Sequence, residues 1–339
     1  MKYAINGKFL CQKITGVQRF SYEIVKELDK IVPKGEFVIV MPKRKCKHIK
    51  LNNIEIVAYG LFSGNVWEQI SFPHYLIKNG LIGINLGNVA PIIKPDIVCI
   101  HDMNLIRHPQ WFSKRYVMWS KIQYRNTMLR AKMILTVSNF SKREIDELYP
   151  QKKPQVYVLS EGWQHMQRII ENESALNKYN LPKNEYFFSL YQAMPNKNFQ
   201  WIVKVAQQNP DKLFVVSGWH NKKVNAADDS FKLIYNLNNV KVLGYLSDED
   251  MKCILKYCKA FLFPSTYEGF GIPPLEAMAV GANVVVSDIP VMHEILGNCA
   301  QYIVDQNNTE LHIKNIDHSC VLNKYSWEKA AYELYSALA

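Results

Sequence analysis

The sequence predicts an α/β protein of two doubly wound domains, each a parallel sheet covered by helices. Short runs rich in β-branched residues alternate with segments of helical periodicity, a pattern typical of βαβ units. The alternation stops over residues 160–182, which contain Gly162 and Pro182 and are predicted to form a linker, and then restarts. The chain of 339 residues is also long enough for two domains of about 150 residues.

The first half contains six expected strands and three expected helices. The strands are Tyr3–Ile5, Phe37–Met41, Ile54–Ala58, Asp96–Ile100, Met133–Val137 and Val156–Leu159. Apolar residues at helical spacing predict a helix from Val17 to Ile31 and a longer one at Trp111–Leu129. Ser138 precedes a third helix, in which Ser141 and Glu144 have the spacing of a capping box.

The second half repeats this pattern. The expected strands are Tyr186–Leu190, Leu213–Val216, Val240–Leu243, Ala260–Phe263 and Val284–Ser287. Helices are expected from Lys197, from Ser247 and near Pro274, and a final helix at Ser326–Leu338. We therefore expect one domain at 1–165, a second at 166–322 and a terminal helical segment at 323–339. Sheets of this kind bind ligands at the carboxyl ends of their strands.

Positive charge is concentrated in the first half. Residues 1–165 carry 25 lysines and arginines against 12 acidic residues, whereas residues 166–339 carry 16 against 18. Such asymmetry indicates an anionic partner: a nucleic acid, an acidic bilayer surface or a phosphorylated substrate. The densest cluster, residues 43–50, contains no aromatic side chain. This disfavours a nucleic-acid-binding module, which would interleave aromatic residues with its charges.

The cysteines and the N-terminus indicate a compartment. Seven cysteines form an odd set without a C-x-x-C pair, so neither a disulfide framework nor a zinc knuckle is predicted. This favours a reducing cytoplasm. The N-terminus lacks the apolar core of a signal peptide, and no run approaches the roughly 18 apolar residues of a membrane span. We expect a cytoplasmic protein, at most peripheral on the inner face of the membrane.

The stretch from Pro264 to Met278 carries the most chemical information. It follows an apolar strand and leads into a helix whose first turn contains Pro273 and Pro274. Glycines beside Glu268 allow a sharp turn, and the free amides of the helix start form an anion site. Carboxylates such as Glu268 and Glu276 suit sugar hydroxyls. On its own, Glu276 is better explained as a first-turn glutamate that stabilises its own helix, and only the whole pattern around it favours a ligand-binding role.

Residues 268–276 read E-G-F-G-I-P-P-L-E and thereby resemble the signature of the retaining glycosyltransferases of family four. The resemblance implies the GT-B architecture, in which two Rossmann-like domains face a central cleft, and it extends to nearly the whole chain. It assigns the acceptor to the first domain and the nucleotide sugar to the second, and the last helix crosses back to the first. The implied donor-binding residues are Gly16, Lys197, Glu268, Gly269, Phe270, Gly271, Ile272 and Glu276.

The same resemblance assigns roles to individual side chains. Lys197, in the first turn of its helix, would clamp the donor phosphates, and His101 would position the sugar and phosphate, with Asp102 orienting it or capping the next turn. Many family members have an arginine six residues before the lysine, where this sequence has Tyr191. Arg19 is our candidate for the phosphate or acceptor contact that this arginine would make. The implied catalytic residues are His101, Lys197 and Glu268.

We expect a metal-independent reaction without a cofactor, in which a hexose-type sugar moves from a UDP- or GDP-sugar to a glycan acceptor. The basic first half of the chain favours an acceptor that is carried on a lipid diphosphate. The motifs most resemble those of enzymes that assemble capsule or O-antigen polysaccharides. Asp248-Glu249-Asp250 matches a metal-binding D-x-D, but acidic residues are expected after the helix-capping Ser247. The alternatives are a GT-B epimerase or hydrolase of nucleotide sugars and, less favoured, a nucleic-acid-binding protein.

Overall fold

The structure, a computed structural model, describes residues 2–44, 46, 49–192, 194–219, 233–305, 307 and 309–338. The chain divides into two compact units. Unit 1 comprises Met1–Pro109, Lys114–Glu161 and Ser326–Ala339, and unit 2 comprises Gln110–Ser113 and Gly162–Tyr325. The sequence predicts domain boundaries after residues 165 and 322, and it places residues 110–113 in the first domain.

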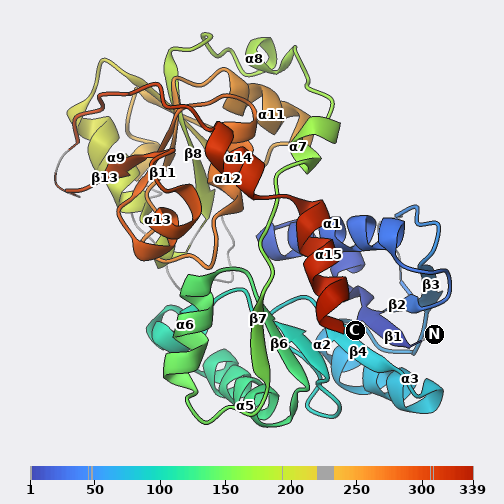
Figure 1. The fold of residues 1–339 in the computed structure, drawn as a ribbon. Helices are drawn as coiled ribbons and strands as arrows, with labels where there is room; N and C mark the ends of the chain where they lie inside the picture. Colours follow the sequence, from blue (N-terminus) through green and yellow to red (C-terminus); the bar gives the residue numbers. More distant parts are fainter. Residues whose placement is uncertain are drawn as a thin grey trace. The chain divides into compact units, whose positions relative to one another are not determined.

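Unit 1 is built on a seven-stranded parallel sheet of order β3-β2-β1-β4-β5-β6-β7. Its strands are β1 Tyr3–Asn6, β2 Phe37–Met41, β3 Glu55–Ala58, β4 Ile82–Asn85, β5 Ile97–Cys99, β6 Met133–Thr136 and β7 Gln155–Val158. Its helices are η1 Gly7–Cys11, α1 Gly16–Ile31, α2 Gly64–Val66, η2 Trp67–Ser71, α3 Phe72–Asn79, α4 Asn104–Arg107, α5 Lys114–Arg130, α6 Asn139–Leu148 and α15 Trp327–Leu338, with η3 Pro109–Trp111 at the boundary between the units (Figure 1).

Unit 2 contains a six-stranded parallel sheet of order β10-β9-β8-β11-β12-β13. Its strands are β8 Tyr186–Gln192, β9 Leu213–Trp219, β10 Val240–Gly244, β11 Ala260–Phe263, β12 Val284–Ser287 and β13 Gln301–Ile303. Its helices are α7 His165–Arg168, α8 Ala175–Lys178, η4 Pro195–Lys197, α9 Phe199–Gln208, α11 Asp248–Lys256, α12 Ile272–Ala279, α13 Pro290–Leu296 and α14 Ser319–Lys324.

Each sheet reverses its strand order once. In unit 1 the chain proceeds outward from β1 in one direction and returns to β4 on its other side; in unit 2 the same reversal separates β8 from β11. The loops that follow such a pair of strands diverge toward opposite faces of the sheet and leave a crevice at the carboxyl ends. The topology therefore offers one ligand-binding position in each unit.

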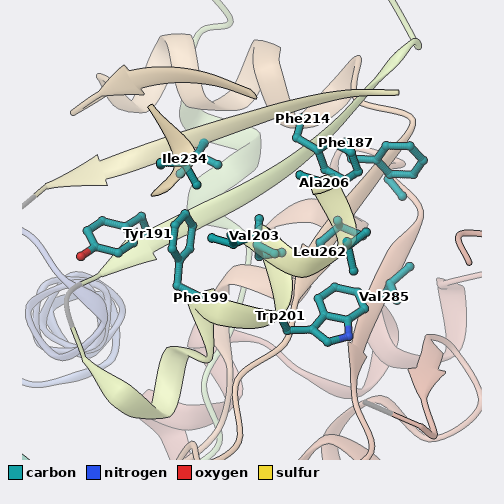
Figure 2. Close-up of a cluster of buried hydrophobic side chains, with 14 of the residues drawn as sticks. Phe187, Tyr191, Phe199, Trp201, Val203, Ala206, Phe214, Ile234, Leu262 and Val285 are labelled. Atoms are coloured by element: carbon teal, nitrogen blue, oxygen red, sulfur yellow. The ribbon is translucent and has the colours of Figure 1, made fainter. Parts of the chain in front are cut away.

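The core of unit 2 fixes the strands on both sides of its reversal. The apolar side chains of α9 and of strands β8, β9 and β11 form one cluster of buried residues, in which Phe187 stacks on Phe214 with ring centroids 5.4 Å apart (Figure 2). Gly218 on β9 has φ +155°, and a Cβ there would lie 1.9 Å from the carbonyl oxygen of Tyr191. Only glycine permits this approach of the two strands.

The last helix, α15, packs in unit 1. It lies beside α1 (Figure 1), and Trp327, fully buried, meets Phe20 of α1 edge to face at 6.1 Å. At its other end the Tyr3 hydroxyl of β1 donates to the carbonyl of Leu338 at 2.7 Å. The last residues of the chain thus form part of the core that surrounds its first strand.

The prediction that the protein has no disulfides was wrong. Cys11 is bonded to Cys46, and Cys299 is bonded to Cys320, whereas Cys99, Cys253 and Cys258 are free and buried. The bonded pairs are far apart in sequence, and pairing depends on Cα separation and Cβ direction, which spacing along the chain does not reveal. The cysteines therefore do not indicate a reducing compartment.

The sequence missed two strands, β4 and β13. The β4 sequence Ile-Gly-Ile-Asn combines apolar residues with two poor strand formers, and Leu76 packs over Gly83, where a Cβ would lie 2.6 Å from Leu76 Cδ1. The expected linker 160–182 contains the short helices α7 and α8. The Ser138 hydroxyl accepts from the Ser141 amide as predicted, but the Glu144 side chain binds Arg107.

Within the part of the chain that the structure describes, no helix has the length and hydropathy needed to cross a bilayer. Of the basic cluster at 43–48, Lys45, Lys47 and His48 lie outside the described residues.

We predict that Trp327→Ala lowers the free energy of unfolding by about 3–5 kcal/mol, because it leaves a cavity between α15 and α1. Tyr332→Ala on the exposed face of the same helix should change it by about 0.5 kcal/mol or less. Urea denaturation followed by circular dichroism measures both. Equal effects of the two substitutions would contradict the packing role of α15.

Candidate active site

Two loops meet at the strand-order reversal of unit 2, one after β8 and one after β11. Lys197 ends the short 3₁₀ turn η4, and Asn198 follows in a left-handed conformation with φ 48°. The helix expected from Lys197 therefore starts at Phe199. Asn196 joins the two loops, because its side-chain amide donates to the Tyr267 carbonyl at 2.9 Å and its own carbonyl accepts from the Thr266 amide at 2.7 Å.

Lys197 and Glu268, which the sequence assigned to one site, are in direct contact. Lys197 Nζ lies 2.6 Å from Glu268 Oε1, and both side chains are mostly buried, with 20% and 15% of their surface exposed. The ammonium also lies 5.4 Å from the ring centroid of Phe263, the last residue of β11. Each charge is therefore held in place by the other at the carboxyl edge of the sheet.

The turn that leads into α12 presents main-chain groups, because the side chains of Phe270 and Ile272 are buried. Gly271, the N-cap, has φ 110°, and a Cβ there would lie 2.8 Å from Met292 Cε. Phe270 meets Tyr325 edge to face at 5.2 Å. Gly269, Phe270 and Gly271 thus contribute main-chain groups at the positive end of the helix.

Glu276, on α12, is held by a histidine that the sequence did not single out. Its Oε1 lies 2.8 Å from Nε2 of the buried His165 on α7. His165 falls in the segment predicted as a linker, so no periodic or motif signal marked it. The carboxylate of Glu276 is therefore oriented by a tertiary contact as well as by its place in the helix.

His101 follows β5 in unit 1 and is almost completely buried. Its Nε2–H donates to the Leu86 carbonyl at 2.8 Å, and its Nδ1 lies 3.6 Å from Oε1 of the buried Glu161. Burial by itself lowers the pKa of His101, but the neighbouring Cys99 and Glu161 outweigh burial and raise the pKa well above its usual value. The imidazolium form is therefore favoured. Asp102 caps the next turn, accepting from the Asn104 amide.

Gly16 and Arg19 lie at the start of α1. A Cβ at Gly16 would meet no atom within 4 Å, so packing within the chain does not explain the glycine. Arg19, in the first turn, is partly buried. Ser138 is the N-cap of α6, and the turn from Val242 to Tyr245 ends β10 with its tyrosine exposed.

Residues 171–324, which include Lys197, Glu268 and Glu276, match the protein family described as "Glycosyl transferases group 1". The chain carries a group 1 glycosyltransferase domain. Together with the relatives described next, this match identifies the protein as an enzyme, a glycosyltransferase of the hexosyl-transferring kind.

The relatives of this glycosyltransferase include two enzymes of O-antigen synthesis. The chain is 28% identical to O-antigen chain mannosyltransferase B of Escherichia coli over 94% of its length and 90% of the relative. It is 28% identical to O-antigen chain mannosyltransferase RfbU of Salmonella typhimurium over 84% of its length and 77% of the relative. Among solved structures, WaaG, a glycosyltransferase involved in lipopolysaccharide biosynthesis, superposes with a TM-score of 0.66 at 14% identity, covering 100% of this chain and 96% of that one.

The fold is accordingly the GT-B architecture, with two Rossmann-like parallel sheets. Tyr191, where many family members have an arginine, belongs to the apolar core of unit 2 and meets Phe199 edge to face at 4.6 Å (Figure 2). It supplies no positive charge, and the phosphate or acceptor contact of Arg19 stays a prediction.

Asp250 of the D-x-D match has a structural role in the glycosyltransferase. Its carboxylate accepts from Lys178 Nζ at 2.6 Å and from the Tyr179 hydroxyl at 2.8 Å, and Ser247 caps the helix as predicted. Among the described residues, no group of three or more His, Cys, Asp or Glu side chains has the arrangement of a metal site. That the reaction needs no metal stays a prediction.

We predict a pH-dependent contribution of the His101–Glu161 pair to stability. The raised pKa of His101 adds to the stability of the folded protein. This contribution is present in full below the ordinary imidazole pKa of about 6.5, and it is lost as the pH rises through the higher pKa of the folded state. The loss of unfolding free energy caused by Glu161→Gln should therefore be larger at about pH 6 than at about pH 9. The exposed Glu185→Gln is the control, and a pH-independent difference in urea denaturation would contradict the raised pKa.

Proposed function

We propose that the enzyme transfers a hexosyl group, with retention of configuration, from a UDP- or GDP-sugar to a glycan acceptor in the synthesis of a surface polysaccharide. The contact between Lys197 and Glu268 at the strand-order reversal of unit 2, inside the matched family region, carries the proposal. The names of the two O-antigen mannosyltransferases support a surface glycan as the product and make mannose the first donor sugar to test.

In this proposal the donor replaces an internal contact. Lys197 exchanges Glu268 for the donor diphosphate, and the released carboxylate accepts hydrogen bonds from the sugar hydroxyls. Glu276, oriented by His165, accepts from the ribose hydroxyls. The amides at the start of α12, including those of Gly271 and Ile272, add positive potential near the diphosphate.

The proposed reaction breaks the bond between sugar C1 and the phosphate oxygen and forms a bond between C1 and the acceptor oxygen on the same face. The leaving phosphate takes the proton of the acceptor hydroxyl, so no nucleophile of the enzyme is needed. Charge develops on the leaving diphosphate, where Lys197 and the helix amides stabilise it electrostatically. His101, buried beside Glu161, is assigned to position the sugar and phosphate, and Arg19 to a further phosphate or acceptor contact.

We further propose that the acceptor is carried on a lipid diphosphate and that α5 contacts an anionic membrane surface. This helix has five basic residues and no acidic one, and among the described residues none of the five pairs with a carboxylate. Large apolar side chains stand on the same outward face, including Met118 and Ile122, which are 64% and 51% exposed. Apolar side chains among unpaired cations are typical of interfacial membrane-binding helices.

We predict that UDP or GDP, in the presence of EDTA, raises the thermal midpoint of unit 2, because a ligand at a hundred times its Kd adds about 2.7 kcal/mol of stability. Lys197→Ala should abolish this shift, whereas the exposed Lys183→Ala should retain it. Differential scanning calorimetry with each nucleotide measures the effect. A shift retained in Lys197→Ala would contradict the phosphate contact.

We predict that Glu268→Gln lowers sugar transfer at least about a hundredfold, because the amide loses the charge-assisted bonds that the carboxylate makes to sugar hydroxyls. Release of nucleotide from UDP-glucose and GDP-mannose, with and without acceptor, measures the rate. Glu185→Gln is the matched exposed control. Near-normal turnover by Glu268→Gln would remove Glu268 from the site.

We predict that Met118→Ser combined with Ile122→Ser lowers binding to phosphatidylglycerol vesicles by about tenfold or more, because two apolar side chains no longer enter the interface. Co-sedimentation measures binding, which should weaken with added salt. Tyr332→Ser, an exposed residue of α15, is the control. Equal binding of the wild type to uncharged phosphatidylcholine vesicles would contradict an anionic partner.

A further inference from the structure

Unit 1 contains a cavity of about 320 Å³ at its own strand-order reversal. The cavity opens beyond the carboxyl ends of β1 and β4, between the start of α1, the turn η2 and helix α5. Six side-chain amides line it: Asn6, Gln12, Gln18, Asn65, Asn88 and Gln123. Tyr116 and Trp119 of α5 supply aromatic surface on one side.

A π-helical turn presents Glu68 to this cavity. Residues Trp67–Ser71 form the wider turn between α2 and α3, and Pro73 lacks the amide that a regular helix would bond to the Gln69 carbonyl. Trp67 is fully buried and its indole N–H donates to the Tyr59 carbonyl at 2.7 Å, which anchors the turn. Single π-turns of this kind occur frequently at functional sites.

The Glu68 carboxylate is buried and held by two neighbours. Its Oε1 accepts from Asn6 Nδ2 at 3.0 Å, and its Oε2 accepts from Lys8 Nζ at 2.8 Å. Asn6 is itself fixed by a bond to Asn85 Oδ1 of the neighbouring strand at 3.1 Å. An ionised carboxylate has about four acceptor positions, so Glu68 retains capacity for a ligand hydroxyl.

Lys8 leaves little positive charge for a phosphate. Its ammonium contacts Glu68 Oε2 and, at 2.9 Å, Asn65 Oδ1. No other Lys or Arg side chain lines the cavity among the described residues. The lining is therefore a neutral ion pair, amides and aromatic rings, and its volume lies at the lower end of the range for small-ligand pockets.

We propose that this cavity binds one uncharged pyranose ring of the acceptor glycan, with Glu68 accepting from its hydroxyls and Trp119 covering an apolar face of the ring. Amide side chains both donate to and accept from hydroxyl groups, and an aromatic ring supplies apolar contact area. The inference rests on the proposed transfer reaction. It makes Glu68 and Trp119 specificity-determining residues for the acceptor, and it assigns the anionic part of the acceptor to a place outside this cavity.

Binding of simple glycosides to the full chain tests the inference without turnover. Saturation-transfer NMR with methyl α-D-mannopyranoside, methyl α-D-glucopyranoside and N-acetylglucosamine should detect binding of at least one sugar. Glu68→Gln should raise its Kd about tenfold through loss of a charged hydrogen-bond acceptor, and Trp119→Ala should remove the signal. Glu55→Gln, at an exposed position of β3, should bind like the wild type.

Three results would overturn the inference: no signal from any of the three sugars, a wild-type Kd in Trp119→Ala, or displacement of the sugar by inorganic phosphate. Trp119 is 40% exposed and lies outside the buried Glu68 network, so its variant gives an answer even if Glu68→Gln does not fold. Calorimetry with UDP and GDP on the same variants tests the donor site separately. Failure of nucleotide binding alongside intact sugar binding would count against the proposed donor site and not against this cavity.

Discussion

The rest of the structure depends on one constraint of parallel sheets: a chain that winds outward from a central strand must return to that strand's other side. Each unit contains this reversal once, at β1 and β4 and at β8 and β11. The diverging loops leave carboxyl-terminal groups that no neighbouring strand covers. In unit 2 these loops carry Lys197 and Glu268, and in unit 1 they border the cavity that Glu68 faces. The two proposed ligand-binding positions thus lie where the strand order of each sheet reverses.

A second regularity is that four carboxylates at or near the proposed sites are paired with cationic or imidazole groups. The four pairs are Glu68 with Lys8, Glu161 with His101, Glu268 with Lys197 and Glu276 with His165. A buried carboxylate without a partner would take up a proton or destabilise the fold. Pairing fixes the direction of the carboxylate oxygens, so they are ready to accept hydrogen bonds. At Glu268 the partner is itself the proposed phosphate ligand, which makes donor binding an exchange of partners.

Much of the fold followed from local patterns because apolar runs and helical spacing are local properties. All eleven expected strands are present, whereas β4, with Gly83 and Asn85, carried no strand signal and is recognisable only from its packing between β1 and β5. The segment 263–278 was informative because a strand, a glycine turn and a proline-started helix are all encoded within a few residues. His165 and Glu161 were missed since their partners lie elsewhere in the chain, and the same reason explains the two unforeseen disulfides.

By itself the sequence determined the α/β class, the two repeated alternations and the loop chemistry around Glu268, because hydrophobic period and turn residues act over short distances. Only the tertiary structure decided which side chains meet. In the folded chain Lys197 contacts Glu268, which lies 71 positions further along the sequence, and Trp327 packs against Phe20. A π-helical turn directs the Glu68 side chain toward the cavity of unit 1. Those contacts depend on strand order and on the direction of each side chain, which are properties of the folded sheet and not of any single segment.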